Sequence, residues 1–142
     1  MKALLDTSVL VPALIAGHPR HVPARSYFDR MLAGEVAVAV ATHVLAETFA
    51  TLTALPVSPQ VTPLEAERLI RERIVANVEV VALGAADYDA VIKRVAGLVS
   101  GTVYDALHVH AAEKAGCAEF VTFNGRDFRR FPLQPPTRLV VL

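Results

Sequence analysis

Several features that would assign a protein to a class are missing from this sequence. It has one cysteine, Cys117, so no internal disulfide can form, and a reducing cytoplasm is the expected compartment. No run of about 20 apolar residues occurs, which argues against a membrane span. Lysines and arginines together number 14, as do aspartates and glutamates, so net charge does not indicate a nucleic-acid partner.

Common catalytic signatures are also absent. The sequence contains no phosphate-binding P-loop, no GxGxxG and no GxSxG nucleophile elbow. The apolar stretch 3–16 includes Asp6 and Pro12, so we do not expect it to be a signal peptide. A chain of 142 residues can bury a core without a disulfide or metal, and we expect one domain over residues 1–142.

What is present is an alternation of short apolar runs and amphipathic segments. The β-branched and apolar runs predict strands at 2–5, 36–41, 78–83, 119–123 and 138–142. Helical spacing and capping signals predict helices at about 7–16, 21–34, 43–55, 63–77, 85–99 and 104–115. Thr7 or Ser8 can cap the first helix, and Thr62-Pro-Leu-Glu65 is a capping box.

This alternation predicts an α/β fold with a mostly parallel sheet flanked by helices. Strands buried on both faces read as continuous apolar runs, as they do here. In open sheets of this kind, ligands bind outside the carboxyl ends of the strands. Functional residues are therefore expected just after strands or in the first turns of the helices that follow.

Four acidic residues occupy such positions. Asp6 ends the first strand inside an apolar segment, where an unpaired carboxylate costs several kcal/mol. Glu47 lies one turn into an apolar helix, Asp105 lies in the first turn of another, and Asp127 follows the fourth strand. Each has a structural alternative. Asp6 could cap a helix, the next two could complement a helix dipole, and Asp127 could be part of a turn.

Together the four acids are better explained as one metal site. Carboxylates gathered at one sheet edge repel each other and require a compensating cation to stay ionised. Mg²⁺ and Mn²⁺ prefer oxygen ligands, and such an ion can activate a water and stabilise charge on a phosphodiester.

Other readings of the polar residues remain open. His43 and Glu47 share one helix face, as do Asp105 and His108, which leaves a zinc site as a minor alternative to surface or core histidines. His108 and His110 should point to opposite faces of their helix. An aspartate-nucleophile phosphatase is disfavoured, because no second acid follows Asp6 at the spacing that resembles Asp-x-Asp-x-Thr.

The motifs resemble the PIN-domain family over the whole chain. They are residues 4–10 (LLDTSVL), Glu47 after a strand, residues 104–108 (YDALH) and residues 121–128 (VTFNGRDF), and their order is similar to that of VapC-type toxins of bacterial toxin–antitoxin pairs. The resemblance implies a sheet of order 3-2-1-4-5 and Mg²⁺- or Mn²⁺-dependent cleavage of RNA by water.

It also implies roles for particular residues. Asp6, Glu47, Asp105 and Asp127 would hold the metal, and Ser8, or with less support Thr7, would orient a carboxylate or a water. Asn124 stands where family members often carry another acid, so a second metal would be held less firmly. This set of seven residues forms the predicted site.

The resemblance further implies a homodimer and a small VapB-type antitoxin that inserts into the acidic groove. Near the C-terminus, Arg126, Arg129 and Arg130 surround Asp127 and are candidates for contacting the RNA backbone. The structural alternative for these arginines is a solvated surface turn. The alternative function is a non-catalytic or housekeeping PIN-domain protein that binds or processes RNA.

Overall fold

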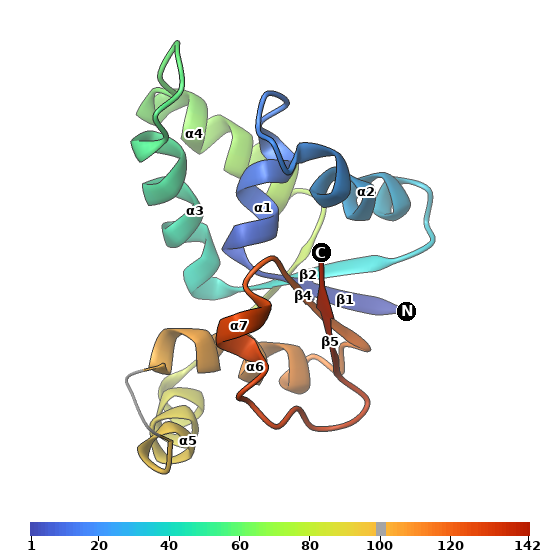
Figure 1. Cartoon of the computed structure of the whole chain (residues 1–142), viewed down its shortest axis with the longest axis vertical. Coiled ribbons are helices and arrows are strands. Elements are labelled where there is room, and N and C mark those ends of the chain that lie inside the picture. Colours follow the sequence, from blue (N-terminus) through green and yellow to red (C-terminus); the bar gives the residue numbers. More distant parts are fainter. Residues whose placement is uncertain (99–101) are drawn as a thin grey trace.

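The computed structural model describes residues 1–98 and 102–142, arranged as a central sheet between two layers of helices (Figure 1). The strands are β1 (Lys2–Leu5), β2 (Ala37–Ala41), β3 (Glu79–Val81), β4 (Glu119–Thr122) and β5 (Arg138–Val141). The helices are α1 (Thr7–Leu14), α2 (His21–Leu32), α3 (Thr42–Ala54), α4 (Pro63–Leu69), the π-helical η1 (Ile70–Val75), α5 (Ala85–Ala96), α6 (Val103–Lys114) and α7 (Gly125–Phe128).

All five strands are parallel, in the order β3-β2-β1-β4-β5, which confirms the predicted topology. The central strand β1 lies between β2 and β4, with Leu4 paired to Ala39 on one side and Phe120 on the other. The chain therefore reverses its direction of progress across the sheet beside β1. This is the position where α/β sheets bind ligands.

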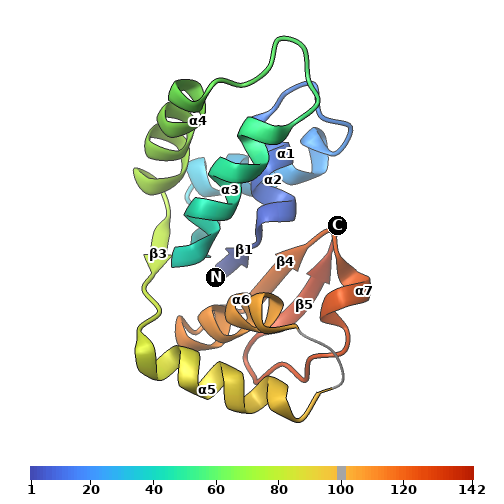
Figure 2. The same cartoon turned by 90° about the vertical axis from the view of Figure 1, so that its left-hand side faces the viewer.

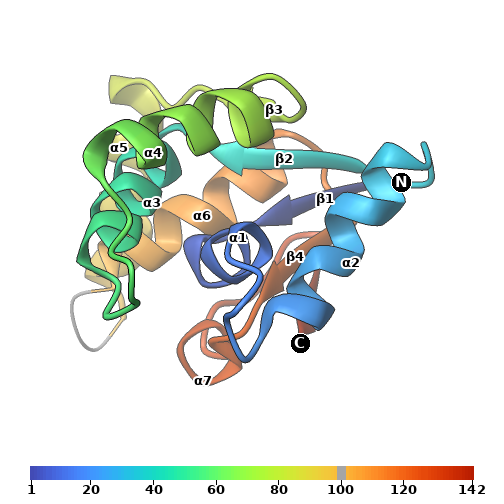
Figure 3. The ribbon, with the colours of Figure 1, turned by 90° about the horizontal axis from the view of Figure 1, so that it is seen from above.

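Helices cover both faces of the sheet (Figures 1 and 2). On one face α1 contacts both α2 and α3, with α4 packed outside α3. On the other face α6 packs across β1, β2 and β4, and α5 covers α6. Seen from above, α1 lies at the carboxyl end of β1 (Figure 3). Because helices cover both faces, most residues of β1 and β2 are apolar and buried, and all residues of β4 are buried although Glu119 and Thr122 are polar.

Most predicted elements are present, but their ends differ. The first helix stops at Leu14 instead of about residue 16, and the residue at its N-cap is Asp6, not Thr7 or Ser8. The Asp6 side chain makes no capping hydrogen bond, because its oxygens bind other groups described below. The third strand is shorter than predicted. The predicted end of α5 at Val99 lies outside the described residues.

The predicted helix from Thr62 to Asn77 is only partly α-helical. Its capping box is present, with Glu65 and Thr62 bonded reciprocally. After Leu69 the chain continues as the π-helix η1, whose wider turn a sequence pattern does not distinguish from an α-helix. Gly34 and Gly116 follow α2 and α6 with positive φ of 74° and 63°, the left-handed conformation in which many helices end.

Within the described residues, no helix is both long enough and apolar enough to cross a membrane.

Candidate active site at the carboxyl edge of the sheet

Asp6 follows the central strand β1 and is only 3% exposed. Ser8 donates a hydrogen bond to its Oδ1 at 2.6 Å, and Thr122 donates one to its Oδ2 at 2.7 Å. Burial raises the pKa of Asp6, whereas nearby His108 and the two hydroxyl donors act to lower it. The carboxylate is thus fixed in orientation and expensive to keep charged.

The two hydroxyl donors are themselves oriented by the backbone after β4. The Phe123 N–H donates to Ser8 Oγ at 2.9 Å, and the Asn124 N–H donates to Thr122 Oγ1 at 2.9 Å. Thr122 is fully buried and was not among the predicted site residues. Its signal in the sequence is a hydroxyl at the end of an apolar strand, which becomes informative only once β4 is known to lie beside β1.

Glu47 projects from α3 and is partly exposed. Thr7 donates a hydrogen bond to Glu47 Oε2 at 2.6 Å, and His108 Nε2 lies 3.4 Å from the same oxygen. Burial acts to raise the pKa of Glu47, but hydrogen bonds from His108 and Thr7, with the charge of the neighbouring histidines, lower it to about 2. Glu47 is therefore ionised at neutral pH.

Asp105 lies in the first turn of α6 and is half-buried. Burial raises its pKa, and the negative charges of Asp127 and Glu47 raise it further, against the opposing effects of His108 and Arg130. Arg130 Nη2 lies 3.6 Å from Asp105 Oδ2. These interactions show that Asp105 lies within electrostatic reach of two of the other predicted acids.

Asp127 is exposed on the short helix α7, and Asn124 is exposed at the N-cap position of the same helix. The Asn124 side chain makes no capping hydrogen bond. The backbone carbonyl of Asn124 accepts a hydrogen bond from the Asp127 N–H at 3.0 Å. Arg126, Arg129 and Arg130 are exposed on α7 or directly after it. The carboxyl edge therefore has a buried side at Asp6 and an open side at α7.

Two histidines join this edge. His43 Nε2 lies 3.3 Å from His108 Nε2, and the ligand atoms of His43, Glu47 and His108 all lie within 4.8 Å of one another. Among the described residues this is the group of possible ligands that converges most closely, and it contains only one of the four predicted acids. The histidine pair joins α3 to α6, a contact that spacing along one helix does not reveal.

His110 lies on the other face of α6, as predicted. Its Nε2 is 2.9 Å from Asp87 Oδ1, and Lys114 Nζ is 2.7 Å from Asp87 Oδ2. This group joins α6 to α5 and takes no part in the carboxyl edge.

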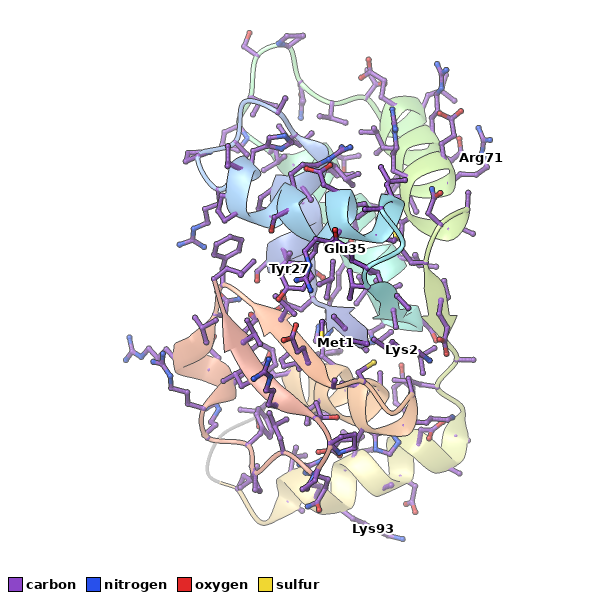
Figure 4. All side chains as sticks on the ribbon, turned by 90° about the vertical axis from the view of Figure 1, so that its right-hand side faces the viewer. Met1, Lys2, Tyr27, Glu35, Arg71 and Lys93 are labelled. Carbon is purple, nitrogen blue, oxygen red and sulfur yellow. The ribbon has the colours of Figure 1, made fainter. Side chains whose placement is uncertain are left out.

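A buried acid at the opposite edge of the sheet shows the contrasting, structural use of a carboxylate. Glu119 begins β4, accepts a hydrogen bond from Tyr27 at 3.1 Å and pairs with Arg138 at 2.7 Å. Figure 4 views this side, with Lys2 at the start of β1 and Tyr27 on α2. Glu119 has a cation and a phenol as partners, whereas the Asp6 side chain is held by hydroxyl donors, with a backbone N–H and a histidine nearby.

Comparison with known proteins agrees with this fold. Residues 3–133 match the PIN domain family. The chain is 32% identical over 122 residues to ribonuclease VapC27 of Mycobacterium tuberculosis, a match that covers 86% of this chain and 84% of that protein. The chain therefore belongs to the PIN-domain family, which confirms the resemblance seen in its motifs.

Solved structures share the fold at lower identity. VapC20 of Mycobacterium tuberculosis, described as a toxin that cleaves the sarcin-ricin loop, superposes with a TM-score of 0.67 at 21% identity, covering 88% of this chain and 92% of that chain. A chain in the structure of VapBC2 from Rickettsia felis, bound to a DNA fragment from its promoter, gives a TM-score of 0.66 at 20% identity, covering 100% and 99%.

Proposed function

We propose that this protein is a metal-dependent endoribonuclease and the toxin of a toxin–antitoxin pair. The observation that carries the proposal is the state of Asp6, a buried carboxylate at the carboxyl end of the central strand, held by two hydroxyls. The chain's membership of the PIN-domain family and its 32% identity to a ribonuclease support RNA hydrolysis as the reaction.

Asp6, Glu47, Asp105 and Asp127 are the proposed ligands for Mg²⁺ or Mn²⁺. The donor set fits a hard cation, because carboxylate oxygens predominate. The positive charge of a bound cation would also offset the desolvation that raises the pKa of Asp6 and Asp105. When bound, such an ion would supply a water of lowered pKa and stabilise negative charge on the phosphodiester.

The surrounding hydroxyls would position these ligands. Ser8 and Thr122 fix both oxygens of Asp6, and Thr7 fixes one oxygen of Glu47. Hydrogen bonds of this kind restrict a ligating carboxylate to one orientation. Asn124 offers an amide in place of an acid, so we propose that a single cation is held more firmly than a second one.

The decisive experiment is cleavage of RNA by metal-free protein to which Mg²⁺ or Mn²⁺ is returned. Wild type should cleave, and both EDTA and Asp6→Asn should abolish cleavage. Asp29→Asn is a matched control, because Asp29 is exposed on α2 and pairs with Arg25. Cleavage that survives Asp6→Asn would contradict the proposed site. RNA binding without cleavage under all conditions would favour the non-catalytic alternative.

Arg126, Arg129 and Arg130 are proposed to contact the RNA backbone beside Asp127. On single strands each neutralised phosphate contributes about 0.7 to the slope of log affinity against log salt. Replacing Arg126 and Arg129 by Gln should therefore weaken binding and lower the slope by about 1.4. Arg71→Gln is the control, since Arg71 lies on η1 and pairs with Glu67 (Figure 4). Unchanged affinity and slope in the double variant would contradict this role.

Toxin function can be tested separately from the chemistry. Expression of the wild-type protein in bacteria should arrest growth, whereas expression of Asp6→Asn should not. Co-expression of a small VapB-type antitoxin encoded in an adjacent reading frame should relieve the arrest. Light scattering should show a homodimer of the free protein. Growth that is unaffected by active enzyme would favour a housekeeping role in RNA processing.

A further inference from the structure

The histidine pair at the carboxyl edge forms a ligand set whose chemistry differs from that of the four acids. His43 Nε2 and His108 Nε2 are 3.3 Å apart. Glu47 Oε2 lies 3.4 Å from His108 Nε2, and Glu47 Oε1 lies 3.9 Å from His43 Nε2. Two imidazole nitrogens and one carboxylate, from two helices, therefore face one another, with one ligand atom of each residue within 4.8 Å of the others.

These separations suit a small tetrahedral ion. Zinc–nitrogen and zinc–oxygen bonds of about 2.0–2.1 Å place neighbouring ligand atoms of a tetrahedron about 3.3–3.4 Å apart. The separation of the two imidazole nitrogens and that of His108 Nε2 from Glu47 Oε2 equal this value. Glu47 approaches His43 Nε2 through its other oxygen, Oε1, at 3.9 Å, so a rotation of the carboxylate would be needed to complete the tetrahedral set. Three protein ligands with one open position are the usual arrangement of a catalytic or exchangeable zinc site.

The three side chains are held in place by different parts of the fold. His43 and Glu47 are spaced by one turn of α3, so they share its face. His108 is 4% exposed on α6, and its ring lies 6.3 Å from the ring of Phe120 and 6.2 Å from that of Phe128. Because the core fixes His108, the donor atoms are brought together before any ion arrives.

The outer nitrogen of each imidazole limits the affinity. His43 Nδ1 and His108 Nδ1 are both buried with no hydrogen-bond partner among the described residues. When both Nε2 atoms bind a metal, each neutral ring carries its proton on Nδ1, where an acceptor normally orients it. Without such acceptors, metal affinity falls by about 10–100-fold. The residue types and their spacing are therefore those of a zinc site that exchanges its ion.

We propose that His43, Glu47 and His108 bind Zn²⁺, or a cation of similar preference for imidazole, in exchange with solution. Imidazole ligands favour zinc over magnesium, whereas the acids alone favour magnesium or manganese. The zinc site is linked to the proposed nuclease function through Glu47, which belongs to both ligand sets. Zn²⁺ bound here would withdraw Glu47 from the carboxylate site and so oppose activation by Mg²⁺.

The test is direct metal binding by the full-length, metal-free protein. Calorimetric titration should show one Zn²⁺ bound at least tenfold more tightly than Mg²⁺. Co²⁺ bound in the same place should give the intense visible absorption of a tetrahedral ion. X-ray absorption of the Zn²⁺-loaded wild type should count two imidazole ligands. An absence of imidazole ligands would overturn the proposal, whatever the variants show.

Variants locate the ion. His43→Gln should weaken Zn²⁺ binding at least tenfold, while His18→Gln, in the α1–α2 connection, should bind like the wild type. Asp127→Asn removes a proposed Mg²⁺ ligand outside the histidine cluster and should leave Zn²⁺ binding unchanged. Zinc binding lost in Asp127→Asn but kept in His43→Gln would place the ion among the acids instead. RNA cleavage is not measured, so failure of the nuclease proposal would leave these outcomes unaffected.

Discussion

At the scale of single residues, the main feature of this protein is a carboxylate buried at a cost. Asp6 is buried, and its side chain accepts hydrogen bonds from Ser8 and Thr122. Hydrogen bonds to the charged form offset part of the desolvation that burial imposes. A buried carboxylate that has lost its hydration in this way would be stabilised by a bound cation.

The hydroxyl of Thr122 is predicted to support metal binding. Thr122→Val keeps the shape of the side chain but removes the donor to Asp6 and the acceptor of the Asn124 N–H. Loss of a group that orients a ligand should weaken Mn²⁺ binding about 10-fold or more. Thr137→Val is a matched control, because Thr137 is also buried but bonds the Cys117 carbonyl. Calorimetry that gives equal Mn²⁺ affinities for the two variants would contradict the prediction.

His43 is predicted to make the metal-free protein less stable in acid. Burial, with the charge of His108, lowers the pKa of His43 from 6.5 to about 4, against the opposing effect of Glu47. As pH falls from 6.5 towards 4, the unfolded chain takes up a proton that the folded chain does not. The free energy of unfolding should therefore fall by up to about 3 kcal/mol over that window.

The measurement is urea unfolding in EDTA at several pH values. His43→Gln should remove this part of the pH dependence, so that the difference between the two proteins shrinks as pH falls. Equal slopes for wild type and variant would show that His43 is not the group responsible.

At the scale of elements, two helices carry the open side of the site. α6 packs across three strands and presents Asp105 from its first turn and His108 one turn later. α7 is a single turn that carries Asp127 and rests against the edge strand β5. The position of Asp127 therefore depends on how closely α7 can approach β5.

Gly125 sets that approach. A Cβ at this position would lie 2.7 Å and 2.9 Å from the two methyl groups of Val141, which is too close for van der Waals contact. Gly125→Ala should displace α7 and cost about 1–3 kcal/mol of stability, with a loss of RNA cleavage through the displaced Asp127.

A double-mutant cycle tests the cause. Val141→Ala removes both methyl groups, so it should restore most of the stability and activity lost in Gly125→Ala. Additive effects of the two substitutions would show that their contact is not what limits the helix.

At the scale of the whole molecule, we expect the carboxyl edge to stabilise the fold only when a cation is bound to it. Asp6→Asn removes a buried charge and should raise the free energy of unfolding in EDTA by about 1 kcal/mol. At a Mn²⁺ concentration of 100 times the dissociation constant, the wild type should gain about 2.7 kcal/mol, and the variant little. The order of thermal stability should thus reverse between EDTA and Mn²⁺. An unchanged order in thermal unfolding would contradict a metal role for Asp6.

The sequence by itself determined the layered fold and the positions of the acids along the chain. Apolar, β-branched runs such as residues 36–41 indicate strands covered on both faces, and their alternation with helices favours parallel pairing. Asp6 was conspicuous because a charge within an apolar run has few structural explanations. Strand and helix propensities and the burial of apolar runs are set by residues close together in the chain, so a sequence alone reveals them.

Only the tertiary structure decided which side chains meet at the site. Thr122 reaches Asp6 because β4 pairs with β1, and His43 reaches His108 because α3 and α6 meet at the same edge of the sheet. These contacts join residues far apart in the chain, and no local pattern records them. The wide turn of η1 was also undetectable, since α- and π-helices share nearly the same apolar spacing.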